Sequence, residues 1–476
     1  MTDELEESSA ETGGGKPDDL LVVGIGASAG GIAALRQFFA NVPAGSGAAY
    51  AVILHLSPDH ESRLSEVLQG TTAMPVSQVQ DRRAIERDHV YVIAPNASLS
   101  IADGHIVAAP LNGRDERRAP VDLFFRTLAD SYGPNAVSVV LSGTGPNGSS
   151  GIKRVKERGG LVIAQDPKEA EYADMPTNSM ATGLVDYVLP VAQIPAKALQ
   201  YHRHLRQVTG ATPERPSVGT EEDGLRAVLT HLRVRTSHDF SNYKPGTILR
   251  RIERRMSVLG LSTLPEYAAF IQQHATEPSA LIKELLISVT NFFRDPDVYV
   301  ALERRVVPEL FHRKRAVDQI RVWVAGCATG EEAYSIAMLL AEYAAATPDA
   351  PRIQLFASDL DERAVAVARD GFYTDAEVAD VSQERLQRFF LRETGGYRVR
   401  RELRELVLFA VHNVIKDPPF SHLDLLACRN LLIYLNRSMQ ERLLETFHFA
   451  LRPGGYLVLG TSESPDGSGD LFVVRD

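Results

Sequence analysis

Two glycine-rich turns, each between a strand-like and a helix-like run, most constrain how this chain folds. Residues 20–25 run into the first turn, Gly24 to Gly31, and residues 320–324 lead to the second, Gly326 to Gly330. A strand that turns sharply through glycines into a helix opens a parallel α/β unit, and such units assemble ligand sites at the carboxyl ends of their strands. Because 476 residues are enough for two domains, we expect two α/β domains with one site each.

The apolar runs of the first half predict a doubly wound parallel sheet. They alternate with amphipathic helical stretches and fall at 20–25, 51–56, 90–94, 137–141 and 160–164. The second half begins with four predicted helices, at 225–232, 247–259, 264–274 and 278–287. Strands return at 320–324, 353–357, 407–410, 423–427 and 455–459. This order predicts a helical subdomain followed by a second α/β domain.

These changes of pattern divide the chain into five parts. Residues 1–19 are acidic and too polar to bury a core, so we expect a disordered tail. Polar residues with prolines and glycines at 201–224 predict a linker. The expected domains are the first sheet domain at 20–200, the helical subdomain at 225–300 and the second α/β domain at 301–476.

Charge and cysteine content narrow the class of protein. A net charge of −10 disfavours nucleic-acid binding, which needs a basic face. Cys327 and Cys428 are too few for a disulfide framework or a Cys-rich zinc site, and we expect both to be small core residues. No run approaches the roughly 18 apolar residues that cross a bilayer. We therefore expect a cytoplasmic protein that is not inserted in a membrane.

The first glycine turn admits three interpretations. As a dinucleotide site it would bind pyrophosphate at the helix N-terminus, but the next strand ends at His55, where such a site needs an acid for the ribose. As a hydrolase site it would make Ser28 the nucleophile, with His55 carried beside it by the adjacent parallel strand. The third interpretation is a tight turn with an incidental serine.

Motifs in the first half favour the hydrolase interpretation. GASAGG, LHLSPDH, YVIAPN, RAPVDLFFR, LSGTGPNG, VIAQD and ADMPTNSM resemble, in order and spacing, the CheB protein-glutamate methylesterase domain of bacterial chemotaxis. The resemblance covers residues 20–190 and implies a triad of Ser28, His55 and Asn147. The family has an aspartate where this chain has Asn147.

The amide at position 147 changes the expected chemistry. A carboxylate orients the catalytic histidine and stabilises its imidazolium, whereas an amide carries no charge and can hold the wrong tautomer. We therefore expect a weak or silent esterase, retained as a docking or regulatory domain. An active esterase is the alternative, with Asp122 or Asp115 as a substitute acid or with a geometry that tolerates the amide.

The second glycine turn predicts a site for an adenosyl cofactor. Its small residues let the backbone close over a ligand, and the next strand ends at Asp359, which suits a ribose diol. Three residues separate Gly326 from Gly330, which is not the spacing of an NAD site. The pattern favours S-adenosylmethionine over the two alternatives, another nucleotide or a structural turn.

Motifs in the second half identify the family it resembles. SVTNFFRDP, VWVAGCATGEEAYSIA, ASDLDERAV, FAVHNVIKDPPF, DLLACRNLLIYL and RPGGYLVLGTSES resemble the CheR protein-glutamate methyltransferases, from about residue 225 to the end. The resemblance implies that Tyr434 lies near the transferred methyl group and that Arg294 holds a carboxylate of cofactor or substrate. Ser288 stands where at least one well-known member of the family has an asparagine. The implied S-adenosyl-L-methionine contacts are Ser288, Thr290, Arg294, Glu332, Asp359, Asn413, Val414, Arg429 and Asn430.

The predicted helix 247–259 carries four arginines, Arg250, Arg251, Arg254 and Arg255, opposite an apolar face. Such a run usually forms a solvated face. The resemblance implies a second role, contact with the acidic helix bundle of a chemoreceptor.

Together these patterns predict a fusion of two opposing activities. The expected reaction is S-adenosylmethionine-dependent methylation of glutamates on the cytoplasmic helices of chemoreceptors or a similar signalling protein. Two alternatives stay open: a non-catalytic signalling scaffold with vestigial sites, and an NAD-dependent oxidoreductase that uses the first glycine turn.

Overall fold

The computed structural model describes residues 19–54, 64–110, 119–209, 218–286, 289–312, 314–375, 377–465 and 471–475. The predicted tail therefore lies almost wholly outside the described residues. Among the described helices, none combines the length and apolar character needed to cross a bilayer.

The first domain contains the predicted parallel sheet, with seven strands in the order β10-β9-β8-β1-β2-β5-β3. Its central strands are buried throughout because helices cover both faces, as parallel sheets require. The strands are β1 (Val22–Ala27), β2 (Ala49–Leu54), β3 (Val76–Val79), β5 (His89–Ile93), β8 (Ala136–Val140), β9 (Leu161–Gln165) and β10 (Tyr187–Leu189). The helices are α1 (Gly31–Ala40), α2 (Leu64–Gln69), α3 (Pro120–Tyr132), α4 (Gly151–Glu157), α5 (Asp174–Ala181) and α6 (Ile194–Thr209). A small antiparallel sheet joins β4 (Arg82–Ala84), β7 (His105–Pro110) and β6 (Ala97–Ala102).

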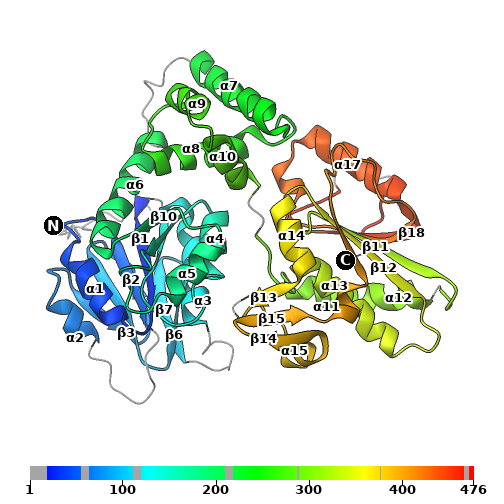
Figure 1. The fold of residues 1–476 in the computed structure, drawn as a ribbon, viewed down its shortest axis with the longest axis horizontal. Coiled ribbons are helices and arrows are strands. Elements are labelled where there is room, and N and C mark those ends of the chain that lie inside the picture. The colour runs from blue at the N-terminus through cyan, green and yellow to red at the C-terminus, as the bar shows by residue number, and fades with distance from the viewer. Residues whose placement is uncertain are drawn as a thin grey trace, which may run out of the picture.

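Four helices form the predicted helical subdomain, at the top of Figure 1 between the two sheets. They are α7 (Val218–Thr236), α8 (Pro245–Leu259), α9 (Leu264–Gln273) and α10 (Glu277–Leu285). Thr263 caps α9 in a capping box with Glu266, which fixes where that helix begins. Within 201–224, where the sequence predicts a linker, α6 continues to Thr209 and α7 begins at Val218. The helix α6 persists there because Tyr201 and Leu205 are buried.

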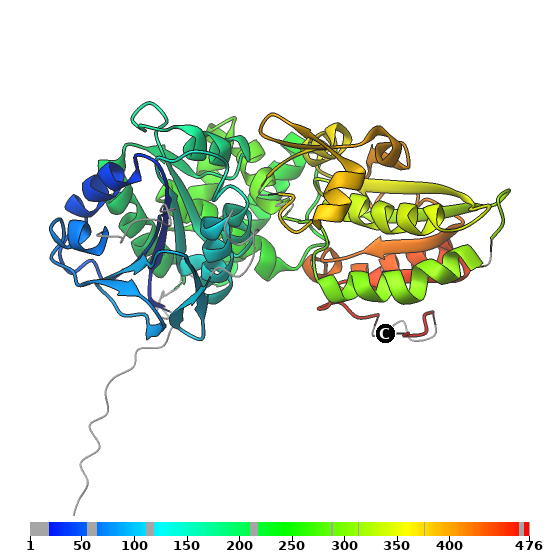
Figure 2. The same cartoon turned by 90° about the horizontal axis from the view of Figure 1, so that it is seen from below.

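The second domain has a five-stranded parallel sheet in the order β16-β12-β11-β17-β18. The first and second domains lie side by side in both views (Figures 1 and 2). The strands of the second domain are β11 (Gln319–Ala325), β12 (Arg352–Asp359), β16 (Val407–Val411), β17 (Leu423–Cys428) and β18 (Leu451–Leu459). Its helices are α11 (Pro296–Ala301), α12 (Val307–His312), α13 (Glu331–Ala345), α14 (Glu362–Asp370), α15 (Gln383–Phe389), α16 (Arg401–Arg404) and α17 (Arg437–Ala450). A smaller antiparallel sheet joins β13 (Phe372–Thr374), β15 (Gly396–Val399) and β14 (Phe390–Glu393). The predicted α/β–helical–α/β architecture is confirmed.

Both cysteines are buried and unbridged, as expected of core residues. Burial raises the pKa of the Cys327 and Cys428 thiols, which keeps them in the unreactive thiol form.

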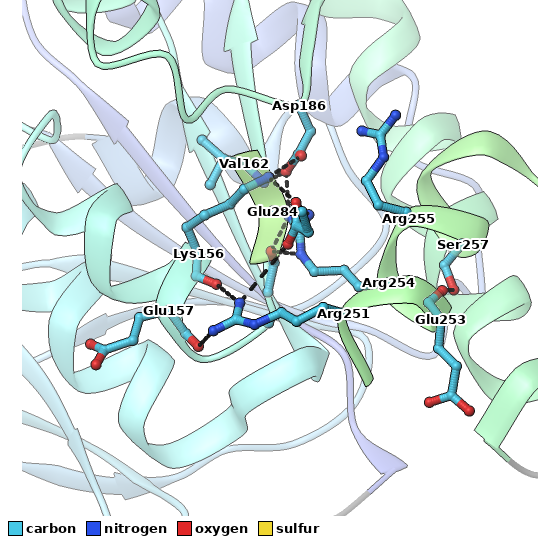
Figure 3. Close-up of polar contacts among 12 residues, drawn as sticks. Lys156, Glu157, Val162, Asp186, Arg251, Glu253, Arg254, Arg255, Ser257 and Glu284 are labelled. Atoms are coloured by element: carbon cyan, nitrogen blue, oxygen red, sulfur yellow. Dashed lines mark hydrogen bonds and ion pairs between the residues drawn. The ribbon is translucent and has the colours of Figure 1, made fainter. Parts of the chain in front are cut away.

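A buried ion cluster joins the first domain to the helical subdomain (Figure 3). Arg254 of α8 contacts Asp186 at 2.6 Å and Glu284 at 2.9 Å, and its side chain is 3% exposed. Lys156 of α4 contacts the same two acids at 2.5 and 3.1 Å. The expectation of a solvated basic face on α8 is therefore wrong for Arg251 and Arg254, because the first domain covers them.

We expect Arg254→Met to lower the free energy of unfolding by about 3–5 kcal/mol, because removing one partner leaves buried charges uncompensated. Urea unfolding of the full chain measures this effect. Arg250→Met is the matched control, since Arg250 lies on the same helix and is exposed. Equal costs for the two variants would contradict the cluster's importance.

The same cluster gives stability a pH dependence. Burial alone would raise the pKa of Asp186, but Arg254 and Lys156 outweigh it and lower that pKa from 3.8 to about 2. An acid with a depressed folded-state pKa contributes stability above its unfolded pKa and loses it as the pH falls through its folded pKa. We therefore expect the Asp186 contribution to disappear between pH 3.8 and about 2, with a shallower acid limb in Arg254→Met.

Candidate functional sites

In the first domain, the structure brings the predicted nucleophile Ser28 against the glycine-rich loop that follows β8, which contains Ser142, Gly143 and Asn147. Ser28 follows β1 directly, and its amide donates a hydrogen bond to the carbonyl of Ser142 at 3.0 Å. The neighbouring Gly143 is closely packed, because a Cβ there would lie 2.8 Å from the Ser28 Cβ and 2.1 Å from the Met175 Sδ. Gly30, with φ of 72°, lets the chain turn from Ser28 into α1. The strand order explains the meeting, since β1 and β8 are neighbours in the sheet.

Of the other two members of the predicted triad, Asn147 is among the described residues and His55 is not. Asn147 lies in the loop after β8, and its buried Oδ1 atom accepts no hydrogen bond from a described residue. His55 lies outside the described residues, directly after Leu54, which is in register with Ala27 at the end of β1. The complete triad therefore stays a prediction.

Asp122, one candidate for a substitute acid, holds the start of α4. Its Oδ1 accepts a hydrogen bond from the Gly151 amide at 2.6 Å, and the residue is buried. Burial raises its pKa, against the opposing effect of backbone N–H groups at Gly148 and Gly151. These contacts hold Asp122 at the start of α4, while its other oxygen, Oδ2, is buried without a partner among the described residues. A role for Asp122 as a substitute acid therefore stays a prediction. Asp115, the other candidate, lies outside the described residues.

In the second domain, a cavity of about 130 Å³ lies at the carboxyl ends of the strands. The turn after β11, the end of β12 and the segments that follow β16 and β17 all contribute to its wall. Ser288 lies outside the described residues, and every other predicted cofactor residue lines this cavity. These residues are Thr290, Arg294, Glu332, Asp359, Asn413, Val414, Arg429 and Asn430.

Asp359 ties the glycine turn to the end of β12. Its Oδ2 accepts a hydrogen bond from the Ala328 amide at 2.8 Å, and its Oδ1 accepts one from the Asp361 amide at 2.9 Å. Burial raises the pKa of this carboxyl, against these backbone donors. Gly330, with φ of 97°, packs so closely on α14 that a Cβ would lie 2.8 Å from the Ala368 Cβ. Both features hold the turn close to the Asp359 carboxylate.

Glu332 and Arg429 form a buried charged pair in the cavity wall. The Arg429 guanidinium lies 3.4 Å from Glu332 and 2.7 Å from Asp295, and it donates to the Arg294 carbonyl at 2.8 Å. Burial raises the pKa of Glu332 to about 7, although Arg429 and Arg294 oppose the shift. The Oε1 atom of Glu332 and the Nε atom of Arg429 are buried without a partner among the described residues.

These groups fit S-adenosylmethionine. Its amino-acid end carries an ammonium and a carboxylate, and the orphaned Glu332 oxygen and Arg429 nitrogen have the complementary polarity. Its ribose diol suits the carboxylate of Asp359, at the strand end where α/β folds bind a ribose. The donor set of the cavity therefore matches the cofactor that the sequence predicts.

Arg294 and Tyr434 line the cavity together with Glu157, a residue of the first domain. Arg294 donates to the Val289 carbonyl at 2.9 Å and lies 3.3 Å from the Glu157 carboxylate, at the end of α4. Burial, followed by the negative charge of Glu157, raises the pKa of Tyr434.

The lining residues that sequence reasoning missed include Glu157, Tyr243, Thr247, Arg251 and His412. Glu157 carries no local signal, because it belongs to the other half of the chain. Arg251 belongs to the basic helix that the sequence marked, but its position in the cavity depends on how the domains pack.

Comparison with protein families agrees with both halves of the chain. The family model "CheB methylesterase" matches residues 23–198. The model "CheR methyltransferase, all-alpha domain" matches residues 223–286, and "CheR methyltransferase, SAM binding domain" matches residues 288–475. The Thermotoga maritima CheB methylesterase catalytic domain is 28% identical, with a TM-score of 0.35, over 37% of this chain and 96% of that one.

Two curated relatives cover different shares of the chain. A 104.1 kDa uncharacterized protein of Rhodobacter capsulatus is 38% identical over 84% of this chain, which spans only 44% of that protein's length. The chemotaxis protein methyltransferase of Escherichia coli is 35% identical over 49% of this chain and 82% of its own length. The chain therefore belongs to the CheR methyltransferase family, with a CheB methylesterase domain in front of its CheR domains.

Proposed function

We propose that this protein methylates glutamate side chains of chemoreceptors, or of a similar signalling protein, with S-adenosylmethionine as the methyl donor. The observation that carries the proposal is that every described member of the predicted cofactor set lines one cavity. The name of the Escherichia coli relative supports a substrate in chemotaxis. The cytoplasmic helices of such receptors would place the reaction in the cytoplasm.

Each part of the cavity has a proposed task in holding the cofactor. Asp359 would accept hydrogen bonds from the ribose diol, and Asn413 and Val414 would line the place of the adenine. Glu332 and Arg429 would pair with the amino-acid end. Ser288, Thr290 and Asn430 complete the proposed set.

The proposed reaction needs positioning more than acid–base chemistry. A glutamate side chain has an ordinary pKa of about 4.3, so at neutral pH its carboxylate is already a nucleophile. Bound S-adenosylmethionine supplies a methyl group that is already activated by the sulfonium. Arg294 would hold a carboxylate at this end of the cavity, and Tyr434 would orient the attacking oxygen. Orientation and exclusion of water would account for the rate, with no general base.

We further propose that the CheB domain is a weak esterase. Ser28 would be its nucleophile and His55 its general base. Asn147 occupies the position of the triad acid but supplies no negative charge to an imidazolium. This domain would then serve mainly to regulate or dock the methyltransferase.

Transfer of labelled methyl from S-adenosylmethionine to cytoplasmic receptor fragments tests the function. We expect base-labile label on glutamates, followed by slow release of labelled methanol. A scaffold with vestigial sites predicts neither transfer nor binding of S-adenosylhomocysteine, and an oxidoreductase predicts nicotinamide binding. Either pattern would contradict the proposal.

The raised pKa of Glu332 predicts proton release when the cofactor product binds. Near pH 7 about half of the Glu332 carboxyls are protonated, and pairing with the ligand's ammonium favours the ionised form. We expect S-adenosylhomocysteine titrations in buffers of different ionisation enthalpy to show release of a fraction of a proton near pH 7 and nearly none at pH 8, where the Glu332 carboxyl is mostly ionised and the ligand's amino group is still protonated. The Glu332→Gln variant should show none at either pH, and equal release by that variant would place the titration elsewhere.

A further inference from the structure

The end of α4 in the CheB domain forms part of the methyltransferase cavity. Glu157, the last residue of α4, lines that cavity, and its side chain is 13% exposed. Its Oε1 atom lies 3.3 Å from the Arg294 guanidinium. A glutamate carboxylate from this same chain therefore occupies the place where the proposed function puts an incoming carboxylate.

Several contacts fix Glu157 in that place. Arg251 of α8 donates hydrogen bonds to the carbonyls of Lys156 and Glu157, both at 3.0 Å (Figure 3). Arg154, one turn earlier on α4, holds the Glu157 Oε2 atom at 2.5 Å. The main chain of Glu157 is thus held by α8, and its carboxylate is held by Arg154 of its own domain and by Arg294 of the methyltransferase domain.

Further ion pairs hold α3 and α4 against the methyltransferase domain. Lys153 lies 2.5 Å from Glu377 and 3.8 Å from the buried Glu331, which follows the second glycine turn. Arg126 of α3 lies 3.7 Å from Asp380. Lys153 and Glu157 lie one turn apart on α4, so they share one face of that helix. On this face Lys153 contacts Glu331 at the start of α13, and Glu157 lines the cavity.

We propose that Glu157 is an internal competitor that occupies the Arg294 carboxylate site of the methyltransferase while the CheB domain is docked. The proposal rests on the proposed function, which assigns a carboxylate ligand to Arg294. Glu157 would compete with one of two carboxylates, that of the acceptor glutamate or that of the amino-acid end of the cofactor. Undocking of α4 would free Arg294 for either.

The test compares full-length protein with its Glu157→Gln variant, which keeps the shape of the side chain and removes its charge. Asp130→Asn is the matched control, because Asp130 pairs with the same Arg154 at 2.7 Å but does not line the cavity. Calorimetry gives the affinity for S-adenosylhomocysteine, and methyl transfer to a receptor fragment gives KM and kcat. Thermal unfolding of all three proteins checks their folding, and Glu157→Ala serves as a second variant.

When a competitor fills the site most of the time, the apparent Kd of the ligand equals its intrinsic Kd divided by the fraction of sites that are free. We therefore expect Glu157→Gln to lower the Kd for S-adenosylhomocysteine, or the KM for the receptor fragment, by about 5- to 20-fold, with Asp130→Asn unchanged. A change in Kd identifies the cofactor's carboxylate, and a change in KM alone identifies the acceptor's.

Two results would overturn the competitor role alone. One is normal binding with unchanged Kd and KM in both Glu157 variants. The other is a stable methyl ester on Glu157 of the wild-type protein, found by peptide mass spectrometry, which would make this residue a substrate. Failure of every protein to bind S-adenosylhomocysteine would instead overturn the proposed function together with this inference.

Discussion

Replacing Asn147 with aspartate should raise the rate of glutamate methyl-ester hydrolysis by up to about 10⁴-fold. The expected gain comes from a carboxylate that sets the tautomer of His55 and stabilises its imidazolium. The position offers an unused acceptor for such an interaction, because the Asn147 Oδ1 atom is buried and accepts no hydrogen bond from a described residue. Methanol release from a methylated receptor peptide measures the rate.

The control for this prediction is the double variant Ser28→Ala with Asn147→Asp. Ser28 lies against the same glycine loop, so its loss should abolish the gain if hydrolysis proceeds through the predicted triad. Equal rates for wild type and Asn147→Asp would mean that another group already supplies the negative charge or that the site is inactive for another reason. Either meaning would contradict the tautomer argument.

Replacing Asp359 with alanine should weaken S-adenosylhomocysteine binding by about 100-fold or more. Two hydrogen bonds from the ribose diol to a carboxylate would be lost, each contributing about 1.5–3 kcal/mol. The Ala328 amide would also lose its acceptor, which loosens the glycine turn. Isothermal calorimetry with the full chain measures the change.

Asp361→Ala is the matched control for this variant. Asp361 lies two residues away and caps α14 by accepting a hydrogen bond from the Arg363 amide, but it does not line the cavity. Its loss should lower stability by about 1 kcal/mol and leave the affinity near the wild-type value. Wild-type affinity in Asp359→Ala would show that the ribose lies elsewhere.

Local sequence patterns were enough to predict both sheets and the glycine turn beside Asp359, whereas the other predicted cofactor residues came from the resemblance to the CheR methyltransferases. The runs at 51–56 and 320–324 appear as the buried strands β2 and β11, because parallel strands covered on both faces need continuous apolar residues. The glycine turn and Asp359 come together because β11 and β12 pair in register, Ala325 beside Ser358. Each of these features depends on residues close in sequence or on neighbouring strands.

Contacts between the domains could not be predicted in the same way. Arg254 and Arg251 have the sequence pattern of a solvated helix face, yet their partners Asp186, Lys156 and Glu157 lie in another domain. No local pattern carries such information. His55 and Ser288 lie outside the described residues and stay predictions.

A crystal structure of the full chain with S-adenosylhomocysteine tests the central claim most directly. The expected result is the ligand in the cavity, its ribose hydroxyls on the Asp359 carboxylate and its amino-acid end beside Glu332 and Arg429. Electron density for the ligand at another place, or a cavity that stays free of it at saturating concentration, would contradict the claim that this is a methyl-donor site.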